Sequence, residues 1–493
     1  MVFNSVGFLF FFPAVVASYF ALPHRFRWIL LLLASYFFYC AWNFRLIWLI
    51  LFTTVVSYCA ALLLTRTKNK KLRKAELLLT LISCLSVLVF FKYFDFLSLS
   101  VTGILRAIQI PAREYTLNLI LPVGISFYTF QTLSYVIDVY YERLEAEKHF
   151  GYYALYVSYF PQLVAGPIER VEALLPQLKK EHAFSTDDFT AGIRIVVSGF
   201  VKKVVVADTV AGYVNAVFNN TAQATGLSVL IAALLFAVQI YCDFSGYTDI
   251  AIGCARIMGI RLMKNFDYPY RAKSIKEFWS RWHISLSSWL RDYIYIPLGG
   301  NRCTRSRRLF NMLVVFLVSG FWHGAAWTFV LWGILHAVYQ IVGELTLDGR
   351  NRLLKMLGLT SDSRPVRLIR QVVTFTLVDY AWMLFRANSI SDFFFLSRKL
   401  FIDWEISMSY LTDSMHSLDG TAYQLLACAL CVVIMILCDL LFTNGKGYGR
   451  SAIEESGFLH TQKNIIYLLW TIAIAWLLLL AGDGASSFIY FQF

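Results

Sequence analysis

The sequence predicts an all-α protein that crosses a membrane several times. Hydrophobic residues make up 58% of its 493 residues, the mean hydropathy is +0.60, and only 15% of the residues are charged. These values are typical of polytopic membrane proteins. The formal net charge is +13, and the charged residues lie mostly between the apolar runs. This pattern indicates cytoplasmic loops rather than a nucleic-acid surface. We therefore expect a helical membrane protein without a nucleic-acid partner.

No metal or nucleotide site is expected. The nine cysteines lie mostly inside apolar runs, where cysteine packs as a small hydrophobic residue. No cluster of histidine, cysteine and acidic residues has metal-ligand spacing, and neither a P-loop nor a dinucleotide glycine fingerprint occurs. No inverted repeat is visible, and residues 1–493 are expected to form one membrane domain.

Apolar runs predict five spans in the first part of the chain. They cover residues 1–22, a run ending at Cys40, and residues 46–64, 77–97 and 117–141. The first run lacks the basic start and the cleavage site of a signal peptide. The strongest basic run, residues 66–74, belongs in the cytoplasm by the positive-inside rule. Counting back three spans puts the N-terminus outside.

The fifth span has one polar face. Gln131, Ser134, Tyr135 and Asp138 are three to four residues apart, so their side chains share one side of a helix. Polar groups at membrane depth normally face the bundle interior.

Two irregular stretches follow. Proline and glycine break residues 160–170, and residues 187–219 are semi-polar, as in an interfacial helix followed by an irregular one. The next span, residues 227–260, is interrupted by a polar segment that contains Asp243, Ser245 and Asp249. These groups need internal partners at membrane depth. A Ser-His-Asp triad at Ser245 is conceivable, but nothing in the sequence fixes its geometry.

Residues 278–293 predict an amphipathic helix. Five apolar residues recur at helical spacing: Phe278, Trp282, Leu286, Trp289 and Tyr293. Glu277 and Arg281 are spaced for an ion pair on the opposite side. So much charge predicts an interfacial or re-entrant helix, with His283 at the edge of its apolar side.

His323 lies inside the apolar stretch 309–342. It is 15 residues beyond Arg308, and a continuous helix would carry it roughly 22 Å into a ~30 Å hydrocarbon core. A histidine at that depth has two explanations. It either belongs to a functional site or forms hydrogen bonds that hold packed helices together. Gly320 and Gly324 would let another backbone approach closely, and 34 residues are too many for one straight span. His336 follows on another helix face and is not an obvious partner.

Four arginines lie between residues 302 and 308, and they have two explanations. They either anchor the next span at the cytoplasmic surface or bind the phosphates of an acyl donor. Further spans are expected at residues 366–384, 425–441 and 465–480.

Several segments resemble the membrane-bound O-acyltransferase family, and in particular its bacterial polysaccharide branch. The resemblance rests on residues 1–5, 34–39, 160–170, 243–250, 278–300, 319–327 and 488–493, so it covers nearly the whole chain. Its most specific parts are Arg281-Trp282-His283 and Phe321-Trp322-His323-Gly324.

The resemblance implies a fold of about 11 transmembrane helices plus re-entrant helices around a central tunnel. It implies transfer of an acyl group, expected to be acetyl, from a cytoplasmic thioester such as acetyl-CoA or an acyl-carrier thioester. The acceptor would be a hydroxyl of an exported polysaccharide such as alginate, and an extracytoplasmic SGNH-type acyltransferase would be the partner. No bound cofactor is implied, and the location would be the bacterial inner membrane.

By this resemblance His323 is the catalytic histidine, acting as general base or acyl relay, and His283 is the second motif histidine. A neutral imidazole, with an ordinary pKa of ~6.5, suits a base whose gain is ~10²–10⁴. The expected supporting residues are Trp279, Trp282, Trp322, Asp243, Ser245, Asp249 and Gln131. The donor-binding candidates are Lys276, Arg281, Arg302 and Arg305.

Two alternatives stay open from the sequence. A proton-coupled transporter would use His323, Asp138, Asp243 and Asp249 as a relay, although such proteins usually contain an internal repeat. An acyltransferase of the same family would instead act on peptidoglycan, teichoic acid, a lipid or a protein.

Overall fold

The computed structural model describes residues 1–441 apart from residues 120, 165 and 362. The regular structure of these residues is helical throughout, with no β-strand among them, which confirms the predicted all-α class. The predicted span 465–480 lies outside the described residues.

The chain forms two compact units. Unit 1 comprises Met1–Val196 and Tyr247–Met263, and unit 2 comprises Val197–Gly246 and the chain from Lys264 onward. Two helices, α10 (Thr186–Phe200) and α12 (Gly226–Ile257), contribute residues to both units.

The multi-pass prediction is confirmed by helix length and composition. Five described helical stretches are long and apolar enough to cross a membrane: His24–Arg66, Lys70–Ala107, Gly226–Ile257, Trp327–Leu345 and Arg364–Arg386. The apolar helix Val6–Ala21 is shorter. These stretches coincide with predicted spans.

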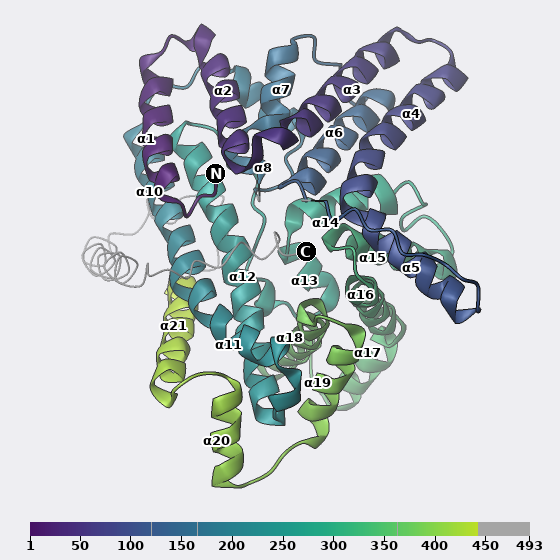
Figure 1. Ribbon diagram of the computed structural model, residues 1–493, viewed down its shortest axis with the longest axis vertical. Coiled ribbons are helices and arrows are strands. Elements are labelled where there is room, and N and C mark those ends of the chain that lie inside the picture. The colour runs from purple at the N-terminus through teal and green to yellow at the C-terminus, as the bar shows by residue number, and fades with distance from the viewer. Residues whose placement is uncertain (120, 165, 362, 442–493) are drawn as a thin grey trace. The chain divides into compact units, whose positions relative to one another are not determined.

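Unit 1 is built mainly from the first half of the chain (Figure 1). Its helices, with the short segments η1 and η2, are α1 (Val6–Ala21), α2 (His24–Asn43), η1 (Phe44–Leu46), α3 (Ile47–Arg66), α4 (Lys70–Leu88), η2 (Val89–Tyr93), α5 (Phe94–Ala107), α6 (Ile125–Tyr140), α7 (Phe150–Ser158), α8 (Phe160–Leu163) and α9 (Val171–Lys179). The break between α8 and α9 confirms the predicted interruption at residues 160–170.

The polar face predicted for the fifth span is confirmed. Helix α6 packs against α3 and α4, and Gln131, Ser134, Tyr135 and Asp138 are all buried. The predicted bounds were wrong at one end, because the helix begins at Ile125 rather than near residue 117. Gly124 precedes it with φ +73°, a left-handed conformation that starts the helix abruptly.

Unit 2 holds the remaining helices. They are η3 (Val201–Ala207), α11 (Asp208–Asn219), η4 (Thr221–Gln223), η5 (Pro269–Arg271), α13 (Ile275–Arg281), α14 (Ile284–Leu290), η6 (Arg291–Tyr295), α15 (Arg305–His323), α16 (Trp327–Leu345), α17 (Leu347–Met356), α18 (Arg364–Arg386), α19 (Ile390–Ile402), α20 (Met408–Ser417) and α21 (Ala422–Leu441). The semi-polar stretch predicted at 187–219 is helical through α10, η3 and α11.

The apolar stretch 309–342 forms a helical hairpin. Helix α15 ends at His323, and α16 runs back beside it from Trp327 (Figure 1). A Cβ on Gly320 would lie 2.4 Å from the Phe329 carbonyl oxygen, and one on Gly333 would lie 2.3 Å from that of Phe316. The close backbone approach predicted at Gly320 is therefore confirmed, whereas a Cβ on Gly324 would meet the Phe329 ring and not a backbone. The sharp reversal between the two helices accounts for the excess length.

The single amphipathic helix predicted at residues 278–293 was wrong. Helix α13 ends at Arg281, α14 begins at Ile284, and His283 between them has φ +45°. The apolar stripe extends across the break because apolar residues of both short helices are buried, so the periodicity did not reveal the break.

Candidate active site

His323 is the last residue of α15, at the turn of the hairpin. Its side chain is 2% exposed. The imidazole packs edge-to-face on three rings, with centroid distances of 5.0 Å to Trp322, 4.9 Å to Trp332 and 5.4 Å to Phe385. Gly324 follows because a Cβ there would lie 2.2 Å from the Phe329 ring. The hairpin thus buries His323 among aromatic side chains.

His283 occupies the break between α13 and α14. The prediction that it lies at the edge of an apolar helix face was wrong, because its side chain is completely buried. Its ring meets Phe244 of α12 at 4.8 Å and Trp322 of α15 at 5.5 Å. Since a left-handed conformation is rare and unfavourable for a residue other than glycine, surrounding contacts must hold His283 in place.

In unit 2, the two predicted histidines, His283 and His323, both contact the side chain of Trp322. The Trp322 indole contacts His283 at 5.5 Å and His323 at 5.0 Å, both in edge-on geometry. All three groups are buried. Residues 40 positions apart in the sequence therefore form one aromatic cluster, which we call the histidine cluster: His283, Trp322 and His323.

The other predicted tryptophans pack beside this cluster. Trp279 contacts Trp332 at 5.6 Å, and Trp282 contacts Trp382 at 4.9 Å. Trp332, Trp382 and Phe385 carry no signal in the sequence, because only the packing of α16 and α18 brings them against the motif residues.

His336 also belongs to this region, although its spacing in the sequence does not pair it with His323. Both imidazoles contact the Trp332 indole, at 4.8 Å and 4.9 Å. The expectation that they occupy different faces assumed one helix, whereas the two residues lie on opposite arms of the hairpin. Trp279 Nε1 donates a hydrogen bond to His336 Nδ1 at 3.3 Å.

The polar segment of α12 finds the internal partner that it was expected to need. Lys203 of η3 is buried, and its Nζ lies 2.8 Å from Asp208 Oδ1 and 2.8 Å from Asp243 Oδ1. We call these three residues the lysine cluster. Because Phe244 follows Asp243 directly, the lysine cluster fixes the part of α12 that packs on His283.

Ser245 is also buried on α12, but no hydrogen bond joins its hydroxyl to another residue within the described chain. It therefore forms no Ser-His-Asp triad in this structure. Two of the predicted supporting residues belong to unit 1. Asp249 is half-buried on α12, and Gln131 donates from Nε2 to the Tyr156 carbonyl oxygen at 2.8 Å.

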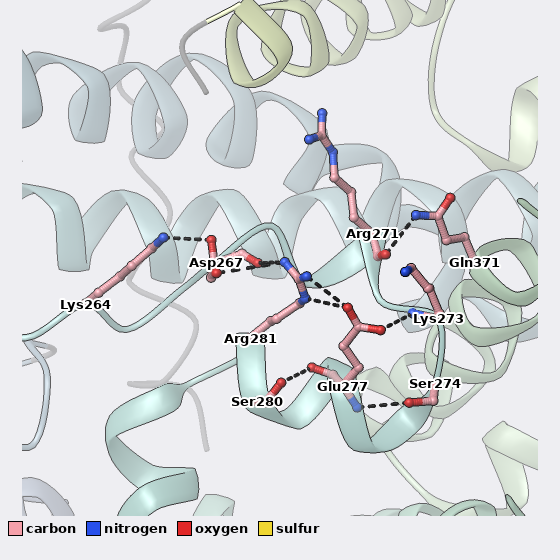
Figure 2. Close-up of polar contacts among 9 residues, drawn as sticks. All are labelled: Lys264, Asp267, Arg271, Lys273, Ser274, Glu277, Ser280, Arg281 and Gln371. Atoms are coloured by element: carbon pink, nitrogen blue, oxygen red, sulfur yellow. Dashed lines mark hydrogen bonds and ion pairs between the residues drawn. The ribbon is translucent and has the colours of Figure 1, made fainter. Parts of the chain in front are cut away.

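Arg281 is committed to a local polar network (Figure 2). It forms an ion pair with Glu277 at 2.9 Å, and its Nη1 donates to the Asp267 carbonyl oxygen at 3.1 Å. Ser274 caps α13 by accepting from the Glu277 amide, which is why the helix starts at Ile275. The network joins the loop before α13 to the end of α13, directly ahead of His283.

The remaining donor-binding candidates are exposed. Lys276, Arg302 and Arg305 lie on the surface of unit 2, and no ion pair of theirs occurs among the described residues. Arg308 is different, because it pairs with Glu344 across the hairpin.

Comparison with known proteins identifies the class. Residues 147–352 match the model of the membrane-bound O-acyltransferase family. A relative from Azotobacter vinelandii, a "Probable alginate O-acetylase AlgI", is 37% identical over 83% of this chain and 80% of its own length. The chain belongs to the membrane-bound O-acyltransferase family and is a multi-pass membrane acyltransferase.

Other relatives show the range of that family. A "Probable alginate O-acetylase AlgI" from Pseudomonas putida is 34% identical over the full length of both chains. A "Peptidoglycan O-acetyltransferase" from Helicobacter pylori is 35% identical over 80% of this chain and 78% of its own length.

Proposed function

We propose that this protein transfers an acetyl group from a cytoplasmic thioester toward a hydroxyl of an exported polysaccharide, with alginate as the first candidate. The observation that carries the proposal is the histidine cluster, two buried imidazoles on one indole in unit 2. The names of the two relatives at 34% and 37% identity support alginate, and the peptidoglycan relative supports a second acceptor.

In the proposed reaction, His323 takes the proton from the acceptor hydroxyl while the oxygen attacks the thioester carbonyl. The carbon–sulfur bond then breaks, and the departing thiolate takes the proton back from the imidazolium. The products are an ester and a thiol, and no net proton is consumed. As an acyl relay, His323 would instead carry the acetyl group on a ring nitrogen between two such steps. General-base assistance of this kind contributes ~10²–10⁴ to the rate.

Acetyl-CoA is the proposed donor, and an acyl-carrier thioester is the alternative. Exposed Lys276, Arg302 and Arg305 supply the positive charge that its phosphates need. Arg281 fits this role less well, because its guanidinium is already paired with Glu277. We place the basic loops at residues 66–74 and 302–308 in the cytoplasm of a bacterial inner membrane and the N-terminus outside.

An extracytoplasmic SGNH-type acyltransferase is the proposed partner that completes transfer to the polymer. The transporter alternative has less support, because two of the three carboxylates of its relay are engaged in ion pairs. Asp138 pairs with Arg143 at 2.9 Å, and Asp243 pairs with Lys203 at 2.8 Å.

The test is the ester content of envelope glycans, measured by mass spectrometry in cells that carry His323→Ala. We expect the O-acetyl esters to disappear while the protein stays in the membrane at its normal level. His416→Ala is the matched control, because His416 is exposed on α20, and it should leave the esters unchanged. Normal ester content in the His323→Ala cells would refute the proposal.

A further inference from the structure

Asn265 lies directly against His283 in unit 2. Its side-chain oxygen Oδ1 is 3.2 Å from His283 Nδ1, 3.1 Å from the Ser285 amide nitrogen and 2.9 Å from Ser285 Oγ. The side chain is 1% exposed. One carboxamide oxygen therefore serves three neighbours in a dry environment, where each hydrogen bond has a strong influence on its partner.

The orientation of this carboxamide is fixed by the backbone. An amide N–H of the main chain can only donate, so the side-chain atom 3.1 Å from the Ser285 nitrogen must be an acceptor. A flipped Asn265 would bring its NH₂ group against that N–H. The assignment of Oδ1 therefore follows from the chemistry of its partner, and not from an arbitrary choice between two similar atoms.

The fixed oxygen determines the tautomer of His283. Because Oδ1 cannot donate, Nδ1 of the imidazole must carry the hydrogen of their 3.2 Å contact. A neutral imidazole has one N–H, so the lone pair is then on Nε2. Ser285 Oγ, 3.4 Å from Nδ1, is consistent with this because its own hydrogen points at Asn265.

His336 has the opposite tautomer and is an internal control. Its Nδ1 accepts from Trp279 Nε1 at 3.3 Å, and an indole nitrogen can only donate. The hydrogen of neutral His336 is therefore on Nε2, and its lone pair is occupied by the indole. Of these two buried imidazoles, only His283 has its basic nitrogen at Nε2.

The backbone holds this arrangement at a strained residue. His283 has φ +45°, and residues on both sides of it pair with the loop that carries Asn265. The Ile284 amide donates to the Asn265 carbonyl oxygen at 2.9 Å, and the Asp267 amide donates to that of Arg281 at 2.8 Å. Figure 2 shows Arg281 contacting Asp267 and Glu277 beside this pairing. These contacts on both sides of His283 keep its unfavourable left-handed conformation populated.

We propose that Asn265 is a positioning residue that holds His283 as the Nδ1–H tautomer, so that neutral His283 accepts at Nε2 during acyl transfer. In this form Nε2 of neutral His283 can accept a hydrogen bond and cannot donate one to an oxyanion, while His323 remains the group that takes the hydroxyl proton. The inference about the tautomer stands on geometry alone, whereas its role in transfer rests on the proposed function.

The first test is the ¹⁵N spectrum of histidine-labelled protein in lipid bilayers, with His283 and His336 assigned by difference from His283→Gln and His336→Gln. We expect a protonated Nδ1 and an unprotonated Nε2 for His283, and the reverse for His336. A protonated Nε2 on neutral His283 would overturn the proposal, whether or not the protein is active in any assay.

The second test asks whether Asn265 sets the tautomer. Asn265→Leu keeps the side-chain size but removes the acceptor, so the His283 signals should show a mixture of tautomers while those of His336 stay unchanged. Asn265→Asp retains an acceptor oxygen and should retain Nδ1–H. Ser285→Ala is the matched control, because it leaves both the backbone donor and Asn265 in place. An unchanged His283 tautomer in a folded Asn265→Leu protein contradicts the proposal.

The activity arm compares the same variants in an acyl-transfer assay. Asn265→Leu should lower kcat on the order of 10- to 100-fold with little change in KM, a part of the ~10²–10⁴ that acid–base catalysis supplies. Asn265→Asp should recover most of that loss, and Ser285→Ala should stay near wild type. A parallel loss of thermal stability and substrate affinity with kcat intact would show a merely structural Asn265. If the wild-type protein had the expected His283 tautomer but no acyl-transfer activity, the proposed function would be wrong and the inference about the tautomer would stand.

Discussion

Trp322 is the side chain on which the two motif histidines meet. Its indole is 3% exposed and contacts His283 and His323 at 5.5 Å and 5.0 Å. Edge-on aromatic pairs of this kind contribute ~0.5–1.5 kcal/mol each beyond the area that they bury. The indole therefore sets the separation of the two imidazoles as well as filling space.

Removing the Trp322 indole should remove the side chain that both imidazoles contact. We expect Trp322→Ala to abolish polymer acetylation and to lower the free energy of unfolding by about 3–5 kcal/mol, the usual cost of truncating a buried large aromatic residue. Trp322→Phe keeps a ring between the histidines and should retain measurable acetylation. The two variants are compared by ester content and by thermal unfolding in detergent. Equal acetylation by the alanine and wild-type proteins would show that the indole has no role.

At the scale of the elements, the α15–α16 hairpin positions His323. The closest approach is at Gly320 and Gly333, where a side chain on either helix would strike a carbonyl oxygen of the other. Carbonyl oxygens belong to the backbone and cannot rotate away, so a Cβ there forces the helices apart.

Gly320→Ala should therefore reduce activity without touching a histidine. We expect it to lower the free energy of unfolding by about 1–3 kcal/mol through overpacking and to reduce acetylation because the α15 terminus moves. Gly343→Ala in α16 is the matched control, because nothing lies within 4 Å of a Cβ at that position. It should be neutral or slightly stabilising, since alanine favours helices over glycine. If both variants behave alike in thermal unfolding and acetylation assays, the close approach is not what positions His323.

A second element-scale feature is the lysine cluster, which joins η3 to α12. Lys203 and Asp243 are nearly inaccessible, and Gly246 lets the backbones approach, because a Cβ there would lie 2.7 Å from the Gly199 carbonyl oxygen. Lys203 lies in the π-helical segment η3, and its ammonium contacts both carboxylates.

Lys203→Met removes the cation that buried Asp243 and half-buried Asp208 share. We expect a loss of about 3–5 kcal/mol in the free energy of unfolding, as for other broken buried ion pairs. The double variant Lys203→Met with Asp243→Asn should recover part of that loss, because it removes one of the stranded charges. Denaturant unfolding in micelles measures both. A single variant as stable as wild type would mean that the cluster is not a stabilising link.

At the scale of the whole molecule, the basic segments predict the orientation in the membrane. Residues 66–74 form the densest basic run, and counting spans from it puts the N-terminus outside. In a cysteine-free background, a cysteine at Lys71 should resist a membrane-impermeant maleimide in spheroplasts, whereas one at Arg113 should react. Both native side chains are exposed, so local burial does not confuse the comparison. If only the cysteine at residue 71 reacted, the proposed orientation would be wrong and the N-terminus would be inside.

Much of the fold was predictable from the sequence, because hydropathy and helical period are local properties. Apolar length predicted the spans and the interruption of residues 309–342, and Gly320 predicted the close helix approach. The break at His283 was not predictable, since its apolar stripe continues across the left-handed residue. Asn265, Trp332 and His336 carry no local signal, because their roles arise from contacts between segments distant in sequence.

We propose that the His323 imidazole catalyses transfer of an acyl group that enters from the cytoplasmic face and leaves toward the opposite face. The most direct measurement uses proteoliposomes of oriented protein, with the extracytoplasmic partner added. Labelled acetyl-CoA is supplied only on the side of residues 66–74, and the polysaccharide only on the opposite side. We predict labelled ester with wild-type protein and with His416→Ala, and none with His323→Ala. Equal labelling by His323→Ala, or labelling only when donor and acceptor share one side, would contradict the account.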